Sequence, residues 1–296
     1  MSVAIGDMRV VADTADVLGE VPLWDAAAGT LTWIDIMKPG CHRLDAATGA
    51  VTSWTPPEKL GSWALRASGG LFTAGRGGLG LWDPEAGTFE RLASPEADRP
   101  GNMLNDGRTD PRGRFVVGSM DKMLTGPNGR LWRVDPDRSV TLLQDADIWL
   151  PNSIAWSPDG RTFYLGDSRT KLIFAYDWDL DTGTPSNRRV FADTAAIPGE
   201  PDGSSVDAEG FLWNARFDGS CLARFAPDGQ LDRIVPTPVS RPSHCTFGGA
   251  DLKTLYVTTA RFRLSAERLA AEPMAGALLA AEVSVAGLPE PVWGGC

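Results

Sequence analysis

One short pattern recurs along the chain: a polar residue, a few small or apolar residues, a turn rich in Asp, Pro or Gly, and an apolar strand. The clearest copies are Asn105–Gly118, Asn152–Gly166 and Asp202–Ala215, and the less regular ones are Glu20–Ile34, Ser62–Gly75 and Ser243–Thr258. Repeats of roughly 40–50 residues built from short strands are typical of a β-propeller. We therefore predict an all-β, six-bladed β-propeller with antiparallel four-stranded blades. Residues 1–296 are expected to form a single domain.

The strands of one blade can be placed directly on the repeat that is fourth along the chain, which begins at Asn152. We expect an innermost strand at Ser153–Trp156, two further strands at Thr162–Asp167 and Leu172–Asp177, and an outer strand at Arg188–Phe191. The turns between them are rich in Asp, Pro and Gly, which fix or tolerate the backbone angles that tight turns need. The repeat therefore supplies one complete blade.

The two ends of the chain are expected to complete the last blade together. Met8–Ala12 and Ala277–Val285 both have strand character, and pairing them would close the ring and remove a free sheet edge. One segment between them departs from the β pattern, because Ser265–Glu272 is rich in helix formers. We predict one short helix there, with Ser265 as its N-cap.

Composition and charge limit the classes of partner. Of the 296 residues, 43% are hydrophobic and 22% are charged, which is enough for a large core and atypical of disordered chains. The formal net charge of −10, without a Lys/Arg cluster, disfavours nucleic acid and favours divalent cations. The sequence contains no run of about 18 apolar residues, so no membrane span is predicted. We expect a small-molecule partner, no nucleic acid and no membrane, and a monomer or weak homodimer.

The cysteines and the N-terminal sequence suggest a reducing compartment. Cys41, Cys221, Cys245 and Cys296 are widely separated, which suits neither a zinc site nor a disulfide framework. We expect all four to be reduced thiols. The first residues lack a basic segment followed by an apolar one, so no signal peptide is predicted. We therefore expect a cytoplasmic protein.

The leading residue of the pattern carries the candidate chemistry. In a propeller the innermost strands face the central channel, so Glu20, Asn105, Asn152 and Asp202 are expected to point into one cavity from four blades. Ser62 would join them. Carboxylate and carboxamide oxygens suit a hard divalent cation. Asp or Asn before Gly also favours turns, but turn preference does not require a Glu at position 20.

A family resemblance rests on five segments that follow one another along nearly the whole chain. They are LGEVPLWD (18–25), LNDGRTDPRGRFVVGSM (104–120), PNSIAWSPDGRTFYLGDS (151–168), EPDGSSVDAEGFLW (200–213) and FGGADLKTLYVTTAR (247–261). In these segments the chain resembles the gluconolactonase family, which includes senescence marker protein (regucalcin) and luciferin-regenerating enzyme. The resemblance implies a six-bladed propeller with a divalent metal at the mouth of its channel. It also implies hydrolysis of a sugar-acid lactone to the aldonic acid in sugar oxidation.

The resemblance also implies roles for individual residues. Glu20, Asn152 and Asp202 match the metal ligands of the family, and Asn105 matches a residue that contacts the substrate or the attacking water. The cation could be Ca²⁺, Zn²⁺, Mg²⁺, Mn²⁺ or Fe²⁺. Our mechanistic hypothesis makes Asp202 both ligand and general base, with Asn105 as its catalytic partner. We expect His244, one of two histidines, to be structural.

The expected substrate-binding residues include one departure from the family. Met103 stands where relatives usually carry Arg, so a guanidinium that would bind the substrate is missing. Arg99, Arg216 or Arg261 could replace it. Asn105, Met103 and Trp63 are the predicted substrate contacts, although a core role is equally compatible with Met103 and Trp63.

Two alternatives use the same fold. The first is a phosphotriesterase-like hydrolase of the calcium-propeller type, which would use the same cation. The second is a non-catalytic propeller that binds a metal or a protein partner. Acidic residues at the channel mouth favour an enzyme, because a scaffold does not need them.

Overall fold

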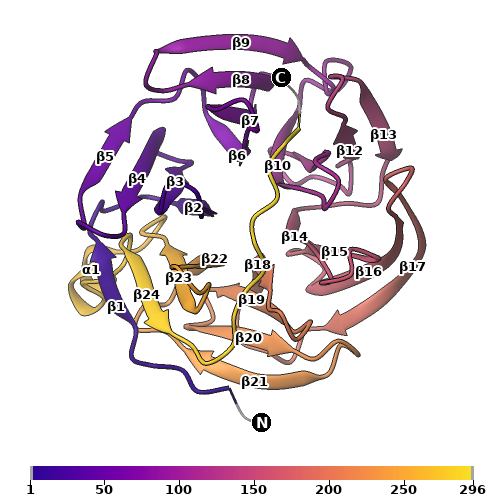
Figure 1. Cartoon of the computed structure of the whole chain (residues 1–296). Helices are drawn as coiled ribbons and strands as arrows, with labels where there is room; N and C mark the ends of the chain where they lie inside the picture. The colour runs from indigo at the N-terminus through magenta and orange to yellow at the C-terminus, as the bar shows by residue number, and fades with distance from the viewer. Residues whose placement is uncertain (1–2, 295–296) are drawn as a thin grey trace. The chain divides into compact units, whose positions relative to one another are not determined.

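The structure is a computed structural model, describes residues 3–294, and is almost entirely β-structure. Within these residues the strands form six four-stranded antiparallel sheets, as Figure 1 shows. These sheets are the blades of a six-bladed β-propeller, so the predicted fold class is confirmed. The chain divides into two compact units with three whole blades each. The first unit comprises Met1–Thr55 and Thr194–Glu290, and the second comprises Pro56–Asp193 and Pro291–Cys296. The single-domain organisation stays a prediction.

The first unit contains the following three blades. One blade consists of β2 (Gly19–Asp25), β3 (Thr30–Asp35), β4 (Gly40–Asp45) and β5 (Val51–Trp54). Another consists of β18 (Glu200–Val206), β19 (Leu212–Phe217), β20 (Cys221–Phe225) and β21 (Leu231–Pro236). The third has the order β1 (Arg9–Ala12), β24 (Leu278–Glu282), β23 (Thr254–Thr259) and β22 (Pro242–Gly248). Strand β22 packs against both β2 and β18.

The two ends of the chain meet in one blade. Strand β1 pairs antiparallel with β24, with Arg9 opposite Ala280 and Val10 opposite Leu279, and Figure 1 shows the indigo strand beside the yellow one. The prediction that both ends share the last blade is confirmed.

The predicted helix is also confirmed. Helix α1 (Ala266–Ala271) lies between β23 and β24, and the Ser265 hydroxyl accepts a hydrogen bond from the Arg268 backbone N–H as an N-cap. Within residues 3–294, no helix has the length and apolarity to cross a bilayer.

The second unit contains the other three blades. One blade consists of β6 (Leu60–Leu65), β7 (Leu71–Gly75), β8 (Gly78–Asp83) and β9 (Thr88–Ala93). The next consists of β10 (Asn102–Thr109), β11 (Phe115–Asp121), β12 (Leu131–Val134) and β13 (Val140–Gln144). The last consists of β14 (Pro151–Trp156), β15 (Thr162–Asp167), β16 (Leu172–Asp179) and β17 (Thr184–Asp193). All four strands predicted from the fourth repeat are present: β15 has the predicted bounds, and β14, β16 and β17 are longer than predicted. Strand β10 packs against β6 and β14.

The hydrophobic core lies between neighbouring blades. Strand β11 shows why, because its alternate residues belong to different clusters: Phe115 and Val117 pack toward the preceding blade, and Val116 packs toward the following one. A strand buried on both faces reads as a continuous apolar run, as in FVVG. The fully buried Trp293, from the C-terminal segment, completes the cluster that contains Phe115, a contact that no pattern in the sequence predicts.

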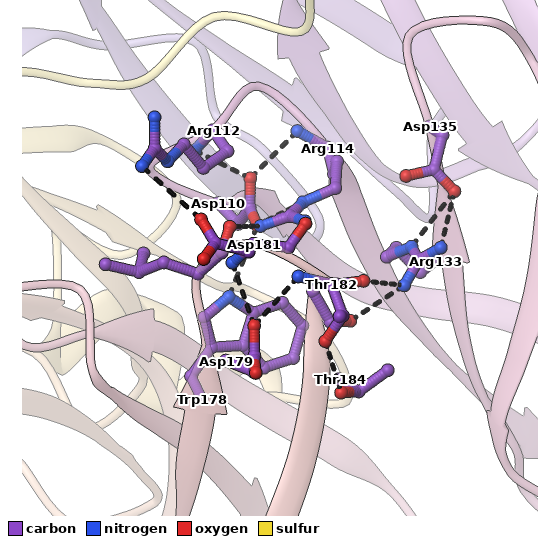
Figure 2. Close-up of polar contacts among 12 residues, drawn as sticks. Asp110, Arg112, Arg114, Arg133, Asp135, Trp178, Asp179, Asp181, Thr182 and Thr184 are labelled. Atoms are coloured by element: carbon purple, nitrogen blue, oxygen red, sulfur yellow. Dashed lines mark hydrogen bonds and ion pairs between the residues drawn. The ribbon is translucent and has the colours of Figure 1, made fainter.

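Charged turns join successive blades of the second unit, and Figure 2 shows one of them. The Asp110 carboxylate accepts hydrogen bonds from the backbone N–H of Arg114, from its Nε at 2.7 Å, and from Trp178 Nε1 at 3.3 Å. The Arg114 guanidinium also donates to the carbonyls of Leu180 and Asp181. The turn that ends β10 is therefore tied to the turn that ends β16, and this holds the two blades together.

The described cysteines are free and buried, as expected for reduced thiols. Cys41, Cys221 and Cys245 are unbonded to one another. Burial raises the pKa of the Cys41 thiol and of the Cys221 thiol, which makes both poor nucleophiles. Cys296 lies outside the described residues.

One buried carboxylate lies between two innermost strands of the second unit. Asp106 in β10 accepts a hydrogen bond from the Ile154 backbone N–H of β14 at 3.0 Å. Burial raises the pKa of Asp106 to about 6, and this hydrogen bond offsets only part of the rise. Asp106 thus links the strands that carry Asn105 and Asn152, at a cost to stability when it is ionised.

Shortening a core side chain of the closing strand should destabilise the protein. Leu279 in β24 is 0% exposed, so Leu279→Ala should lower the free energy of unfolding by about 2–5 kcal/mol. Leu231, which is 45% exposed, is the matched control, and Leu231→Ala should cost less than about 1 kcal/mol. Urea denaturation measures both values. Equal losses from the two substitutions would contradict the burial of β24.

The Asp106 carboxyl should make stability depend on pH. Its pKa in the folded state lies above that in the unfolded state, so the unfolded state releases the proton first and stability falls as pH rises from about 4 to about 6. Asp106→Asn retains an acceptor for Ile154 and removes the charge. The variant should gain up to about 3 kcal/mol relative to the wild type between pH 4 and pH 7. A difference in unfolding free energy that stays constant with pH would contradict this assignment.

Candidate active site

The predicted site residues lie at β-bulges of the innermost strands. In each of β2, β10, β14 and β18, one extra residue interrupts the pairing with the next strand. Glu20 and Asn152 are the last paired residues before their bulges, whereas Asn105 and Asp202 lie inside theirs. A bulge changes the direction of a side chain relative to the sheet. The repeated polar position of the sequence thus coincides with a repeated irregularity of the backbone.

The backbone is strained at two of these bulges. Val21 and Ser153, which follow Glu20 and Asn152, have φ angles of 45° and 59°. This left-handed conformation is unfavourable for a β-branched residue such as Val21. Strain of this kind persists where surrounding structure enforces it and is frequent at functional sites.

In the second unit, Asn105 and Asn152 contact each other. Asn105 Nδ2 donates to the Pro151 carbonyl at 2.9 Å and to Asn152 Oδ1 at 3.3 Å. Asn152 Nδ2 in turn donates to the Ser168 hydroxyl at 2.8 Å. Because its nitrogen is bound to Ser168, the carboxamide of Asn152 presents its oxygen on the side where Asn105 lies. That oxygen is the atom a cation would bind.

In the first unit, the two carboxylates lie on strands that share a neighbour. Glu20 is on β2 and Asp202 is on β18, and β22 packs against both strands. Glu20 Oε2 accepts a hydrogen bond from the Val21 N–H at 3.2 Å. Both acids are nearly buried, with 7% of Glu20 and 8% of Asp202 exposed. Two nearly buried carboxylates bring negative charge to these positions, which is the kind of charge that balances a divalent cation.

A buried arginine supports the strand that carries Asp202. Arg216 donates to Asn214 Oδ1 at 3.1 Å, and Asn214 Nδ2 donates to the Asp202 backbone carbonyl at 2.9 Å. The remaining hydrogen bonds of Arg216 go to Thr194 and to the carbonyls of Ile197, Pro198 and Gly199. Burial lowers the pKa of Arg216 to about 10, although nearby Cys221, Glu200 and Asp202 act to raise it. Arg216 thereby positions β19 and the loop before β18.

The arginines proposed to replace the missing guanidinium at Met103 have other partners. Arg216 is wholly buried and occupied as described. Arg99 donates to the carbonyls of Asn128 and Asp145 and forms an ion pair with the Asp145 carboxylate. The side chain of Arg261 packs against Gly276. These contacts favour structural roles for all three.

His244 has a close-packed position beside Asp202. A Cβ at Gly203 would lie 2.0 Å from the imidazole, so only glycine fits there. The ring Nδ1 lies 3.0 Å from the Cys245 carbonyl, and the side chain is buried. This packing is in line with the structural role that we expect for His244.

The predicted substrate contacts differ in accessibility. Trp63 is completely buried, which favours a core role, and its contact with substrate stays a prediction. Met103 is 8% exposed and lines a cavity of about 310 Å³ within the second unit. Asp121 and Asp167, at the ends of β11 and β15, accept backbone hydrogen bonds and so stabilise the turns there.

The donor set fits a divalent cation. Glu20, Asn152 and Asp202 offer oxygen atoms and two negative charges, the combination that hard divalent cations prefer. Among residues 3–294, no group of three or more His, Cys, Asp and Glu side chains is arranged to hold a metal. Among the described residues a metal would therefore need donors of another type as well, and a carboxamide oxygen is one such donor.

Sequence reasoning missed the residues that orient these donors. Ser168 follows β15, which pairs with β14 so that Asn152 lies opposite Gly166. Asn214 lies opposite Ser204, just beyond the bulge that contains Asp202. Ser168 thus lies just beyond the strand that pairs with the strand of Asn152, and Asn214 lies within the strand that pairs with the strand of Asp202. This register was the signal that could have found them.

Comparison with known proteins agrees with the fold and the repeats. The model of the SMP-30/Gluconolactonase/LRE-like region matches residues 18–261. A 6-deoxy-6-sulfogluconolactonase from Pseudomonas putida is 37% identical, over 97% of this chain and 99% of that protein. An L-arabinolactonase from Azospirillum brasilense is 35% identical, over 96% of this chain and 94% of that protein.

A solved structure extends the likeness to three dimensions. The calcium-binding protein regucalcin from Agrobacterium tumefaciens superimposes with a TM-score of 0.92 at 34% identity, over 97% of both chains. The likeness therefore covers the whole propeller and all four bulged strands. On the family match, the relatives and the shared structure together, the chain belongs to the SMP-30/gluconolactonase/LRE-like family.

Proposed function

We propose that this protein hydrolyses a sugar-acid lactone to the aldonic acid and uses one divalent cation to do so. Its class as a lactone-hydrolysing enzyme rests on the family, since two curated relatives that match nearly the whole chain are named as lactonases. One observation carries the rest of the proposal: oxygen-bearing side chains recur at the bulges of four innermost strands.

The residues proposed to hold the cation are Glu20, Asn152 and Asp202. In support, each is nearly buried and each lies at or in a bulge, where its direction is set by the backbone. Bound there, a divalent cation supplies a Lewis acid for the lactone carbonyl and lowers the pKa of water. The relative named as calcium-binding makes Ca²⁺ one candidate, and Zn²⁺, Mg²⁺, Mn²⁺ and Fe²⁺ remain in the proposal.

Hydrolysis requires one proton transfer in each direction. In our scheme Asp202 accepts a proton as a water molecule attacks the lactone carbonyl carbon, and the ring C–O bond then breaks. Asp202 returns the proton to the departing alkoxide, which becomes a hydroxyl group. Asn105 Nδ2 already donates to Pro151 and Asn152, so in our scheme the carboxamide oxygen of Asn105 accepts from the water or from a sugar hydroxyl and orients it. The product is an acid that ionises, and the net charge of −10 favours its release.

A lactone panel tests the function directly. The metal-stripped protein should release acid from at least one aldonolactone when one of the divalent ions is restored. Asp202→Ala should lower that rate by at least about 100-fold, because it removes a donor and the base. Acid release in weakly buffered solution is the measurement. Asp228→Ala, at an exposed turn of the same unit, is the control and should keep the wild-type rate.

Two outcomes would contradict the proposal. Wild-type rates from Asp202→Ala on every lactone that the protein hydrolyses would exclude the role given to Asp202. Hydrolysis of phosphotriesters with no lactone turned over under any ion would favour the phosphotriesterase-like alternative.

The Ser168 hydroxyl should influence metal affinity although it is not a ligand. Ser168 binds the Asn152 nitrogen, and loss of such a partner usually lowers metal affinity about 10–100-fold. Ser168→Ala should therefore raise the dissociation constant of the cation, as measured by calorimetric titration. Ser157→Ala, in the next turn of the same blade, should leave it unchanged. Identical affinities in the wild type and Ser168→Ala would indicate that Asn152 is not a ligand.

A further inference from the structure

A cavity adjoins the innermost strand directly before Asn105. Its volume is about 310 Å³, and all of its lining residues belong to the second unit. The lining comes from the turn between β7 and β8, from the connection between β9 and β10, and from Met103, Leu104 and Lys122. A ligand that contacts Asn105 could therefore extend into this cavity past Met103.

Two cations lie at the cavity, Arg76 in the β7–β8 turn and Lys122 just after β11. The Arg76 backbone N–H donates to the Lys59 carbonyl at 2.9 Å, which fixes the turn. Its side chain is exposed and makes no hydrogen bond or ion pair with residues 3–294. Lys122 Nζ donates to the Pro100 carbonyl at 2.8 Å, which uses one of its three N–H groups. Both side chains have donors left for a ligand.

The carboxylate that lines the same cavity is already satisfied. Glu96 accepts hydrogen bonds from Asn102 Nδ2 at 2.8 Å, from the Ser119 hydroxyl at 2.8 Å and from Trp132 Nε1 at 2.6 Å. Arg130 NH1 lies 3.9 Å from its second oxygen and offsets its charge further.

The same holds at the turn that carries Arg76. Glu58 behind the turn pairs with Arg91 at 2.7 Å and accepts from the Gly77 N–H. The nearby acids are thus paired with protein donors, whereas the two cations retain unused ones.

We propose that this cavity binds an anionic substituent of the lactone, a sulfonate, carboxylate or phosphate at the end of the sugar chain remote from the ring carbonyl. The inference rests on the proposed function, because it places the reacting ring beside Asn105. Arg76 and Lys122 bind the anion by charge-assisted hydrogen bonds. Met103 contacts the carbon chain of the sugar. The substrate's charge is then bound by Arg76 and Lys122 and not by an arginine at position 103.

The net charge of −10 does not oppose this binding. At physiological ionic strength the screening length is about 8 Å, so distant acids contribute little at the cavity. Of the charged residues that line the cavity, Glu96 accepts hydrogen bonds from protein donors, whereas Arg76 and Lys122 have no carboxylate partner among the described residues. An anion in the cavity would therefore meet two cations with unused donors although the whole protein is negative.

The test compares lactones that differ only in this end group. D-Gluconolactone carries a hydroxyl at carbon 6. Two probes carry a sulfonate or a phosphate in place of this hydroxyl, and in the third probe carbon 6 is a carboxylate. In the wild type, at least one anionic lactone should exceed the neutral one in kcat/KM by 10-fold or more. Arg76→Gln and Lys122→Met should each reduce this ratio at least 5-fold, mainly through KM. The relative rates of the three anions identify the group.

Arg112→Gln is the matched control, because Arg112 is also an exposed arginine at a turn of the second unit, paired only loosely with Asp181 at 3.8 Å. It should leave the ratio unchanged. A second readout is calorimetric binding of the anionic open-chain acids, which should weaken with salt and with Arg76→Gln.

The outcomes separate the two proposals. If neutral lactones are hydrolysed as well as anionic ones, and Arg76→Gln changes nothing, the cavity proposal is wrong and the lactonase proposal stands. If no lactone is hydrolysed but the anionic acids bind in an Arg76-dependent manner, the cavity proposal stands and the reaction is wrong. If neither hydrolysis nor such binding is found, both are wrong.

Discussion

One extra residue in the innermost strand of a blade is the constraint on which the site depends. A regular strand would direct alternate side chains to its two faces, and in β10, for example, the blades of β6 and β14 pack against the strand. The bulges in β2, β10, β14 and β18 interrupt this alternation at the polar residue of each repeat. Polar side chains can thereby leave the core without breaking the rest of the sheet. The sheets of the propeller hold the backbone of each strand in place, and the bulge sets the direction of the polar side chain.

The site is also supported from behind by hydrogen bonds that have no role in chemistry. Ser168 fixes the orientation of Asn152, and Arg216 acts on the Asp202 backbone through Asn214. Such partners keep the donors in place before a ligand arrives, so less ordering is required on binding. Burial of Arg216 costs desolvation, which lowers its pKa, and its hydrogen bonds to a whole loop offset part of that cost.

The fold could be predicted from the sequence because its signals are local and repeated. The four strands of the fourth blade and the Ser265 cap depend on neighbours in sequence, and all are found where they were predicted, although three of the strands are longer. Trp293 could not be predicted, because its pocket forms from residues of two blades far away in the chain. For the same reason, the hydrogen bond of Ser168 to Asn152 and the hydrogen-bond partners of Arg216 could not be predicted. The roles of the site residues themselves stay predictions, since repetition indicates where they lie and not what they bind.

We propose that different residues determine the choice of substrate and the catalysis. Residues that recur in the repeats are proposed to hold the cation, whereas Met103, Arg76 and Lys122 do not recur and are proposed to select the lactone. In this division the residues that select the lactone differ from those that hold the cation, so the substrate can change while the cation site stays the same.

The central claim is that Glu20, Asn152 and Asp202 share one cation. Anomalous diffraction from crystals grown with Mn²⁺ tests it most directly, because the signal locates the ion without assuming its ligands. The account predicts one strong peak within about 2.0–2.6 Å of an oxygen of each of the three side chains. A peak that lies elsewhere, or none at these residues under saturating Mn²⁺, would contradict it.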